Sequence, residues 1–287
     1  MLLVDKPSGI SSHDVVNDIR RRFGTRRVGH AGTLDPLATG VLVVAVGPAT
    51  RFLQYLPLEP KTYVADVRFG QSTETYDREG KVTQERPAPN DLKDALERVR
   101  GGFLGLVQQV PPMHSAIKVK GKPLYSYARK GQEIAREART VHISEFEVLE
   151  CEGARAKIKI VCSGGTYIRT IANDLGERIG CGAHLEALVR TAVGKFDLGM
   201  SIPLANTTPS MLISLAEALP PMPIIDMDPE QTHHILEGRQ VRIEGPPSNF
   251  LVALRNPSGM VFSVARLLGN VLQPECVIPG EAVLDPS

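Results

Sequence analysis

One carboxylate is placed by its neighbours in a way that suits catalysis. Asp35 lies in the stretch Gly29–Leu42, between Gly32 and Pro36. Pro36 fixes its own φ and disfavours helical geometry for the residue before it, so we expect Asp35 to be extended. Glycines in this loop allow the backbone to approach a ligand closely. A carboxylate held at the apex of such a loop can act as a nucleophile or a base, although Asp-Pro is also an ordinary turn dipeptide.

Apolar patterns predict the elements that would position this loop. Residues 2–5 are extended, and Ser12 is predicted to cap a helix that ends at Gly24. Residues 62–69 and 156–162 alternate apolar and polar side chains, which is typical of strands. Elements of both kinds therefore surround the candidate carboxylate.

Two further helices are predicted between these strands and after them. Asn90 is expected to cap the first, which ends at Gly101. In the second, apolar residues recur at helical spacing through 168–179. Tyr167 and Arg169 lie off this apolar stripe, so they can face something other than the core.

The last sixty residues form a separate unit by pattern. Pro and Met residues at 220–223 break the preceding pattern and mark the best boundary. Asp228, followed by proline, predicts a helix start, and Gly238 predicts its end. Short β-like runs follow at 239–243, 250–255 and 260–266. We therefore predict two domains, 1–225 and a small β-rich 226–287.

Charge is divided unevenly between these two parts. Residues 226–287 carry 4 basic and 8 acidic side chains, whereas residues 1–225 carry 29 basic and 24 acidic ones. The basic side chains bunch into two groups: Arg20, Arg21, Arg22, Arg26 and Arg27, and then Lys118, Lys120, Lys122, Arg129 and Lys130. Such groups indicate a polyanion as partner, although most charge runs are simply solvated faces.

The cysteine spacing indicates no metal site, and the hydropathy indicates no membrane-spanning segment. The four cysteines have neither Cys-x-x-Cys spacing nor a neighbouring histidine, so we predict reduced thiols and no metal site. No apolar run is long enough to cross a bilayer, and no secretory leader is expected. The predicted compartment is the cytoplasm.

The loop around Asp35 closely resembles the catalytic motif of the TruB-type tRNA pseudouridine-55 synthases. In that family the Asp of Gly-x-Leu-Asp-Pro-Leu-Ala-Thr-Gly is the catalytic residue. Three more segments match in the family's order, and the resemblance spans about residues 2–200. They are Asp5-Lys6-Pro7-x-Gly9-x-Ser11-Ser12, Lys61-x-Tyr63 with Gly70-x-x-Thr73-x-Thr75-x-Asp77, and Gly165-Thr166-Tyr167-Ile168-Arg169-Thr170 with Gly182-Ala183-His184-Leu185 and Leu188.

The resemblance implies an ion pair at the catalytic centre. Arg169 would pair with Asp35 and keep it ionised and oriented, although such pairs are often structural. Asp77 matches the family pattern as well. We leave it out of the predicted site, because an Asp after Thr-x-Thr-x also suits an ordinary turn.

The resemblance also implies four residues that bind the target nucleotide. A uridine inside a folded tRNA arm must be flipped out before it reacts, and His30 would fill the vacated place. Tyr63, which the resemblance also places among the catalytic residues with Asp35 and Arg169, would stack on the flipped base. Tyr167 would contact the uracil edge, and Leu188 would wall the pocket. Each has an ordinary alternative as a core or surface residue.

The implied fold is mixed α/β (α+β), with a pseudouridine synthase catalytic domain on an antiparallel sheet. The C-terminal residues 226–287 resemble a small PUA-like RNA-binding domain. Their net negative charge is unusual for that role, and a packing appendage is the alternative.

The implied reaction isomerises one uridine in the TΨC arm of tRNA to pseudouridine. It breaks the N1–C1′ bond and joins C5 to C1′ without oxidation, so no cofactor is expected. Whether Asp35 attacks the base, attacks C1′ or abstracts a C2′ proton stays open. The predicted partner of this monomer is tRNA, with no protein partner. Two rival functions are a tRNA-binding or folding protein without catalysis and a base-excising glycosylase, which would need a second acid.

Overall fold

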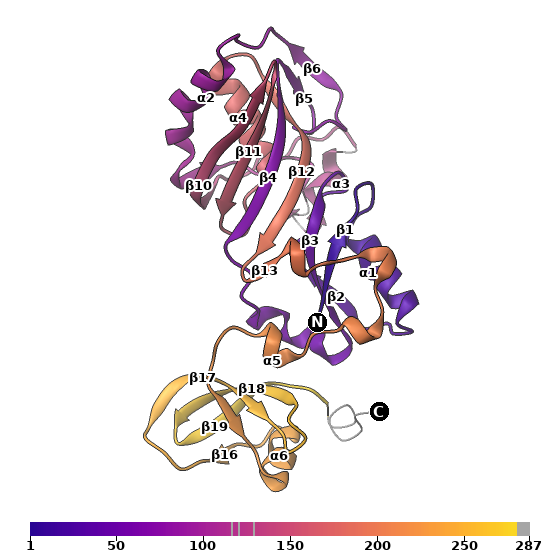
Figure 1. The fold of residues 1–287 in the computed structure, drawn as a ribbon, viewed down its shortest axis with the longest axis vertical. Coiled ribbons are helices and arrows are strands. Elements are labelled where there is room, and N and C mark those ends of the chain that lie inside the picture. The colour runs from indigo at the N-terminus through magenta and orange to yellow at the C-terminus, as the bar shows by residue number, and fades with distance from the viewer. Residues whose placement is uncertain (116, 120, 129, 280–287) are drawn as a thin grey trace.

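The elements follow one another along an elongated body. The computed structural model describes residues 1–115, 117–119, 121–128 and 130–279. Figure 1 shows three parts along the long axis: strands β4 and β10 to β12 with helices α2 and α4, then β1 to β3 with α1, and last the C-terminal strands. None of the helices in these described ranges is both long and apolar enough to cross a membrane.

A mixed sheet, largely antiparallel, links the first two parts. In the described chain it has ten strands, in the order β14-β1-β3-β12-β4-β11-β10-β7, with β13 beside β12 and β2 beside β3. Only the pairs β1–β14 and β3–β12 are parallel. The strands are β1 (Leu2–Lys6), β2 (Val28–Ala31), β3 (Thr39–Val46), β4 (Lys61–Phe69), β7 (Gly105–Gln109), β10 (Arg139–Glu152), β11 (Arg155–Cys162), β12 (Ala183–Val193), β13 (Phe196–Asp197) and β14 (Ile202–Pro203).

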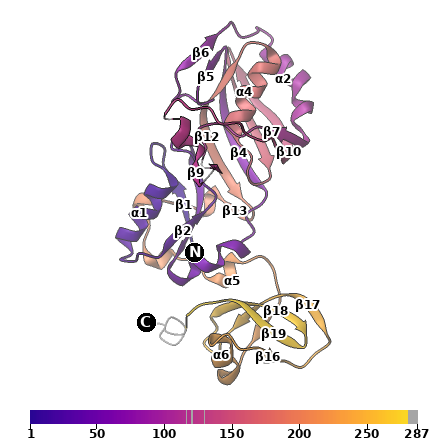
Figure 2. The same cartoon turned by 180° about the vertical axis from the view of Figure 1, so that it is seen from behind.

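Helices cover one face of the sheet in each part. Helices α2 (Leu92–Arg100) and α4 (Ile168–Ile179) enclose an apolar core with the inward residues of β4, β11 and β12. Helix α1 (Ser12–Arg22) packs on β1 to β3 through Val15, Val16 and Ile19. Figure 2 views the molecule from behind, so that α4 lies in front of the sheet. The predicted mixed fold on an antiparallel sheet is confirmed.

Strand and helix positions agree with the sequence patterns, but two predicted caps are wrong. Ser11, not Ser12, caps α1, because its hydroxyl accepts from the Asp14 N–H while the Asp14 carboxylate accepts from the Ser11 N–H. Asp91, not Asn90, precedes α2, and it makes no side-chain cap. Ser12 is instead buried, and its hydroxyl donates to the carbonyl of Leu34 in the loop that carries Asp35.

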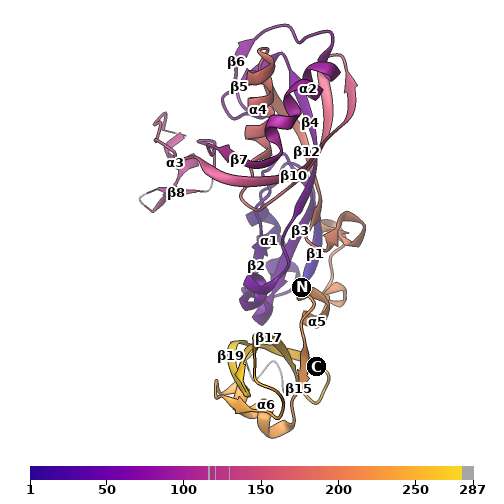
Figure 3. The ribbon, with the colours of Figure 1, turned by 90° about the vertical axis from the view of Figure 1, so that its left-hand side faces the viewer.

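An arm projects from the end of β7. It contains β8 (Lys118–Val119), β9 (Lys122–Pro123) and α3 (Leu124–Ala128), and Figure 3 shows it pointing away from the body. Part of the second predicted basic group lies on this arm. Lys120 and Arg129 of that group fall outside the described residues. A second hairpin, β5 (Gln71–Thr73) with β6 (Val82–Glu85), flanks β12.

The C-terminal strands form a separate five-stranded sheet. Its order is β15-β17-β18-β19-β16, and α6 (Pro229–Leu236) starts with the predicted Asp228 cap. Strands β15 and β19 of this sheet were not predicted. The short helix α5 (Leu215–Ala218) precedes the sheet, whose strands are β15 (Ile224–Asp226), β16 (Val241–Arg242), β17 (Ser248–Arg255), β18 (Val261–Gly269) and β19 (Val271–Val277).

This small sheet shares one apolar cluster with strands and turns of the N-terminal part of the chain. Phe262 and Leu254 belong to the same cluster as Val43 and Phe52. Tyr55 also reaches across, and its hydroxyl lies 3.3 Å from a carboxylate oxygen of Glu275. The sheet is therefore packed against the rest of the chain and is not a tethered module.

A glycine in β3 permits a close approach to β12. Gly40 has φ +101°, and a Cβ there would lie 2.2 Å from the backbone carbonyl oxygen of Arg190. We expect Gly40→Ala to lower the free energy of unfolding by more than about 2 kcal/mol, since strain in φ and a backbone clash add.

The matched control for this substitution is Gly238→Ala. Gly238 has φ +78°, and a Cβ there would have no atom within 4 Å. This variant should lose only about 1 kcal/mol, the cost of the left-handed backbone alone. Urea unfolding measures both, and equal losses would contradict the role of the close strand approach.

Candidate active site

The predicted pair of Asp35 and Arg169 is present. Arg169 Nε lies 2.8 Å from Asp35 Oδ2 as an ion pair, although its N–H direction falls outside hydrogen-bond geometry. Arg169 Nη2 donates to Asp35 Oδ1 over 3.3 Å. Each carboxylate oxygen of Asp35 therefore contacts a different guanidinium nitrogen, a two-point geometry that a lysine ammonium cannot reproduce.

Arg169 is itself held on its other sides. Only 4% of its surface is exposed, and Nη1 lies 3.5 Å from Asp77 Oδ2. Nη1 also donates to the carbonyl of Thr75, and Nη2 donates to that of His114. Asp77, which was left out of the predicted site, therefore belongs to it as the second carboxylate on Arg169.

The N-terminal segment fixes the loop that carries Asp35. The buried Lys6 ammonium donates to the carbonyls of Pro7, Ile10 and Pro36, and the Pro36 contact is 3.3 Å. The Ser12 hydroxyl accepts from the N–H of Leu34 at 2.8 Å and donates to its carbonyl. Asp35 thus stands between two residues whose backbones are tied to the start of the chain.

Arg190 fixes the same loop from β12. It is 1% exposed, and its Nε donates to the carbonyl of Val41 at 2.8 Å. Its Nη2 donates to Gly32 and its Nη1 to Thr33. Burying a cation is costly unless its donors are satisfied, and here the loop carbonyls satisfy them.

The environment of Asp35 opposes its ionisation more than it helps. About a third of the side chain is exposed. Burial of the rest raises the pKa of Asp35 above its usual value, while the Arg169 charge opposes this rise and the Asp77 charge adds to it. A carboxylate with a raised pKa is a better base than an ordinary one, provided that it is ionised.

The four predicted binding residues lie on β2, on β4, on β12 and directly before α4. Tyr63 is buried on β4, where it pairs with Arg190 of β12 in the strand register. Burial raises the pKa of Tyr63, and the Arg190 charge opposes the rise. Leu188 is buried on β12 in the same apolar core as Tyr63. Tyr167 is half-buried directly before α4, two residues from Arg169.

His30 lies on β2, which leads into the loop that carries Asp35. It is half-buried, and its Nδ1 has no hydrogen-bond partner in the described chain. Burial lowers the pKa of His30, and the charge of Arg190 lowers it further. The imidazole is therefore neutral at neutral pH.

Sequence reasoning missed the residues that hold the site. Lys6, Ser12 and Asp77 fall inside the matched segments, so the motif itself was the available signal. Arg190 lies just beyond the matched Leu188, and an arginine in a strand gives no local sign of burial. Within the described ranges, no group of three or more His, Cys, Asp or Glu side chains could hold a metal ion.

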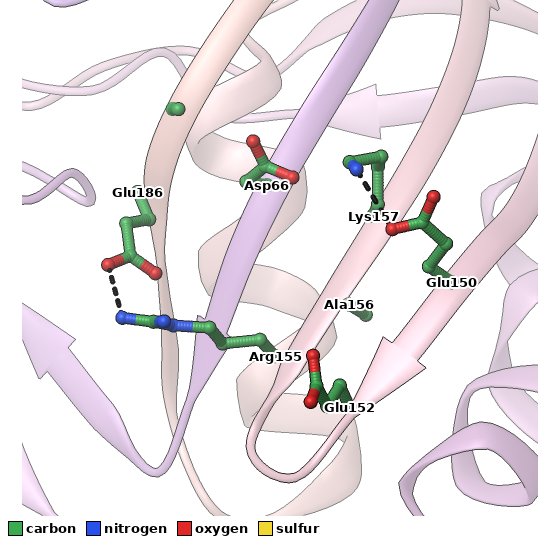
Figure 4. A pocket seen from close by; sticks show the side chains of 8 residues that line it. Asp66, Glu150, Glu152, Arg155, Ala156, Lys157 and Glu186 are labelled. Carbon is green, nitrogen blue, oxygen red and sulfur yellow. Dashed lines mark hydrogen bonds and ion pairs between the residues drawn. The ribbon is translucent and has the colours of Figure 1, made fainter.

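A charged depression lies elsewhere on the same sheet. Figure 4 shows Asp66, Glu150 and Glu186 with Arg155 and Lys157 around it. Asp66 alternates with Tyr63 and Ala65 on β4, so it faces the opposite side of the sheet. Lys157 pairs with Glu150 and Arg155 with Glu186. The depression is a solvated ionic face and is separate from Asp35.

Known proteins match almost the whole chain. The model of the TruB family pseudouridylate synthase N-terminal domain matches residues 20–168, and that of the tRNA pseudouridylate synthase B C-terminal domain matches residues 169–214. A tRNA pseudouridine synthase B from Thermobifida fusca is 41% identical over 290 residues, with 98% of each chain covered.

The chain belongs to the TruB family of pseudouridylate synthases.

Other TruB relatives and solved structures agree. The tRNA pseudouridine synthase B of Syntrophotalea carbinolica is 41% identical over 282 residues, which cover 90% of this chain and 92% of that one. A crystal structure of a Cbf5-Nop10-Gar1 complex contains a chain with TM-score 0.66 and 25% identity, covering 98% of this chain and 85% of that chain. The predictions of the family and of the enzyme class, a tRNA pseudouridine synthase and thus an isomerase, are confirmed.

Asp77 should set the pH at which the TruB site loses activity. Because burial raises the pKa of Asp35, the reaction rate should fall on the acid side above the ordinary carboxyl pKa of about 3.8. Asp77→Asn removes a negative charge that raises this pKa. We therefore expect the acid limb of the single-turnover rate to move to lower pH, with a lower plateau because Arg169 loses a partner.

The control for this pH profile is Asp66→Asn. Asp66 lies on the opposite face of the sheet, so its variant should keep the wild-type limb and plateau. An acid limb that moves to higher pH in Asp77→Asn would contradict the assigned electrostatics.

Proposed function

We propose that this protein isomerises one uridine in the TΨC arm of tRNA to pseudouridine, with Asp35 as its catalytic carboxylate. The observation that carries the proposal is the two-point contact of Arg169 with a partly exposed Asp35. A structural ion pair would not require a rigid loop clamped by Lys6, Ser12 and Arg190. Such clamping preorganises a reacting group.

The chemistry needs one ionised carboxylate. The N1–C1′ bond breaks, the uracil turns, and C5 bonds to C1′. C5 then loses its hydrogen as a proton, and N1 takes up a proton in exchange. Asp35 can act on the base, on C1′ or on the C2′ proton, and each route requires the ionised form that Arg169 favours. The atoms balance without any co-reactant, so the proposal includes no cofactor.

The remaining site residues are proposed to receive the flipped nucleotide. His30 fills the vacated stack, and its lowered pKa supports this role because a neutral ring stacks without desolvating a charge. Tyr63 stacks on the uracil, Tyr167 contacts its edge and Leu188 walls the pocket. Tyr63 and Leu188 are each 6% exposed, so the base must displace part of their present cover.

The proposed contact with tRNA includes the basic groups. Arg21 and Arg22 pair with Asp18, so Arg26 and Arg27, which are exposed next to β2, are the better candidates for phosphate contacts. We propose residues 226–287 as a PUA-like RNA-binding domain. The five-stranded sheet supports this, and its acidic balance places any RNA contact on a limited part of its surface. Action as a monomer in the cytoplasm stays a prediction.

Carbodiimide mapping of unmodified tRNA treated with the purified protein tests the function. We expect one new pseudouridine in the TΨC arm and an unchanged RNA mass. A tRNA whose target uridine is replaced by cytidine is the control and should gain none.

The rival functions give different products in the same reaction. A glycosylase would release free uracil and lower the RNA mass, and a tRNA-folding protein would leave the uridine unchanged. Either result with folded, tRNA-bound protein would overturn the proposal.

A further inference from the structure

A buried glutamine at the root of the arm holds the backbone of Tyr167. Gln109, the last residue of β7, is 3% exposed. Its Oε1 accepts from the Tyr167 N–H at 2.8 Å, and its Nε2 donates to the Tyr167 carbonyl at 3.0 Å. One side-chain amide thus binds both backbone polar groups of a residue 58 positions away.

This contact lies at the start of α4, the helix that carries Arg169, so it affects the geometry of the site. Tyr167 occupies the N-cap position of α4 but contributes no side-chain cap, and its carbonyl also accepts the helical bond from the N–H of Ile171. The preceding turn contains Gly164 and Gly165, which restrict the backbone least. Without Gln109, nothing else in the described chain hydrogen-bonds the N–H of Tyr167. The start of α4 would then be held by packing, by the helical bond from Ile171 and by the side-chain contacts of Arg169, with no bond to the N–H of Tyr167.

Arg169 lies in the first turn of α4, so its guanidinium moves with that turn. The same arm root contacts Arg169 directly, because the carbonyl of His114 accepts from Nη2 at 3.0 Å. Residues 109–114 therefore bind the start of α4 at three points, two at Tyr167 and one at Arg169. The segment that returns from the arm toward β10 contacts this base as well, because Arg136 donates to the carbonyl of Pro111.

We infer that Gln109 is a positioning residue that fixes the backbone of Tyr167 and, through the first turn of α4, the Arg169–Asp35 contact. The base of the arm, residues 109–114, is thereby coupled to catalysis. The inference rests on the proposed function of this site. Gln109 touches neither Asp35 nor any reacting atom. It acts through the backbone from which both active-site side chains project.

The test substitution is Gln109→Met, which keeps the volume and removes both hydrogen bonds. We expect a loss of about 10²-fold in the single-turnover rate at saturating tRNA, the scale of a misplacement near 1 Å. Affinity for tRNA should stay within about twofold, because phosphate contacts dominate it. The acid limb of the rate should move to higher pH, since a looser Arg169 lowers the pKa of Asp35 less.

Gln108→Met is the matched control. Gln108 precedes Gln109 on β7, is exposed and donates to the Thr140 hydroxyl. It should keep the wild-type rate and acid limb. If Gln109→Met does not fold, Gln109→Glu carries the test, because it keeps the acceptor and loses the donor to the Tyr167 carbonyl. For this variant the rate at pH values above the acid limb is compared, because its added negative charge itself raises the pKa of Asp35.

Rates are normalised to folded protein by circular dichroism, so a merely structural role would leave the normalised rate and the acid limb unchanged. That result, with active wild-type protein, would overturn the inference. Wild-type protein without any isomerisation would instead overturn the proposed function.

Discussion

The site depends on one buried guanidinium. Arg169 has almost no exposed surface, yet its donors meet two carboxylates and two backbone carbonyls. A buried cation with unsatisfied donors would destabilise the fold, so the chain must bring Asp35, Asp77, Thr75 and His114 to it. Fold and catalytic geometry are therefore constrained by the same contacts.

The two carboxylates on Arg169 have different surroundings. Asp77 is buried, and its Oδ1 also accepts from the Thr75 hydroxyl and from the N–H of Glu79. Within the residues that the structure describes, the Asp35 carboxylate has Arg169 alone as its partner, and it keeps a third of its surface open. Asp77 is thus the structural carboxylate of the pair, and Asp35 is the one that remains able to react.

Much of the fold was predictable because its elements have regular patterns. The alternation of 62–69 and the helical spacing of 168–179 both correspond to real elements, β4 and α4. The matched motifs also led to Asp35 and Arg169, whose contact the structure contains. Each of the two wrongly predicted caps lies one residue from the observed one. Adjacent Ser11 and Ser12 both have a hydroxyl that can cap a helix, and adjacent Asn90 and Asp91 both have a side-chain oxygen that can do so.

The supporting residues could not be predicted from local pattern. Asp77 looks like a turn residue until Arg169, 92 positions later, is placed beside it. Gln109 and Arg190 act only through backbone groups distant in sequence, and such contacts leave no periodic signal. The division into 1–225 and 226–287 stays a prediction, since the shared apolar cluster crosses that boundary.

The central claim is that the Asp35 carboxylate performs the chemistry, and tritium release from tRNA with C5-labelled uridine tests it most directly. C5 must lose its hydrogen when it bonds to C1′. Asp35→Asn keeps the loop and its clamps but removes the charge that Arg169 complements. The account predicts release by wild-type protein and a loss well beyond about 10⁴-fold in the variant at unchanged tRNA affinity. Release by Asp35→Asn at the wild-type rate would contradict it.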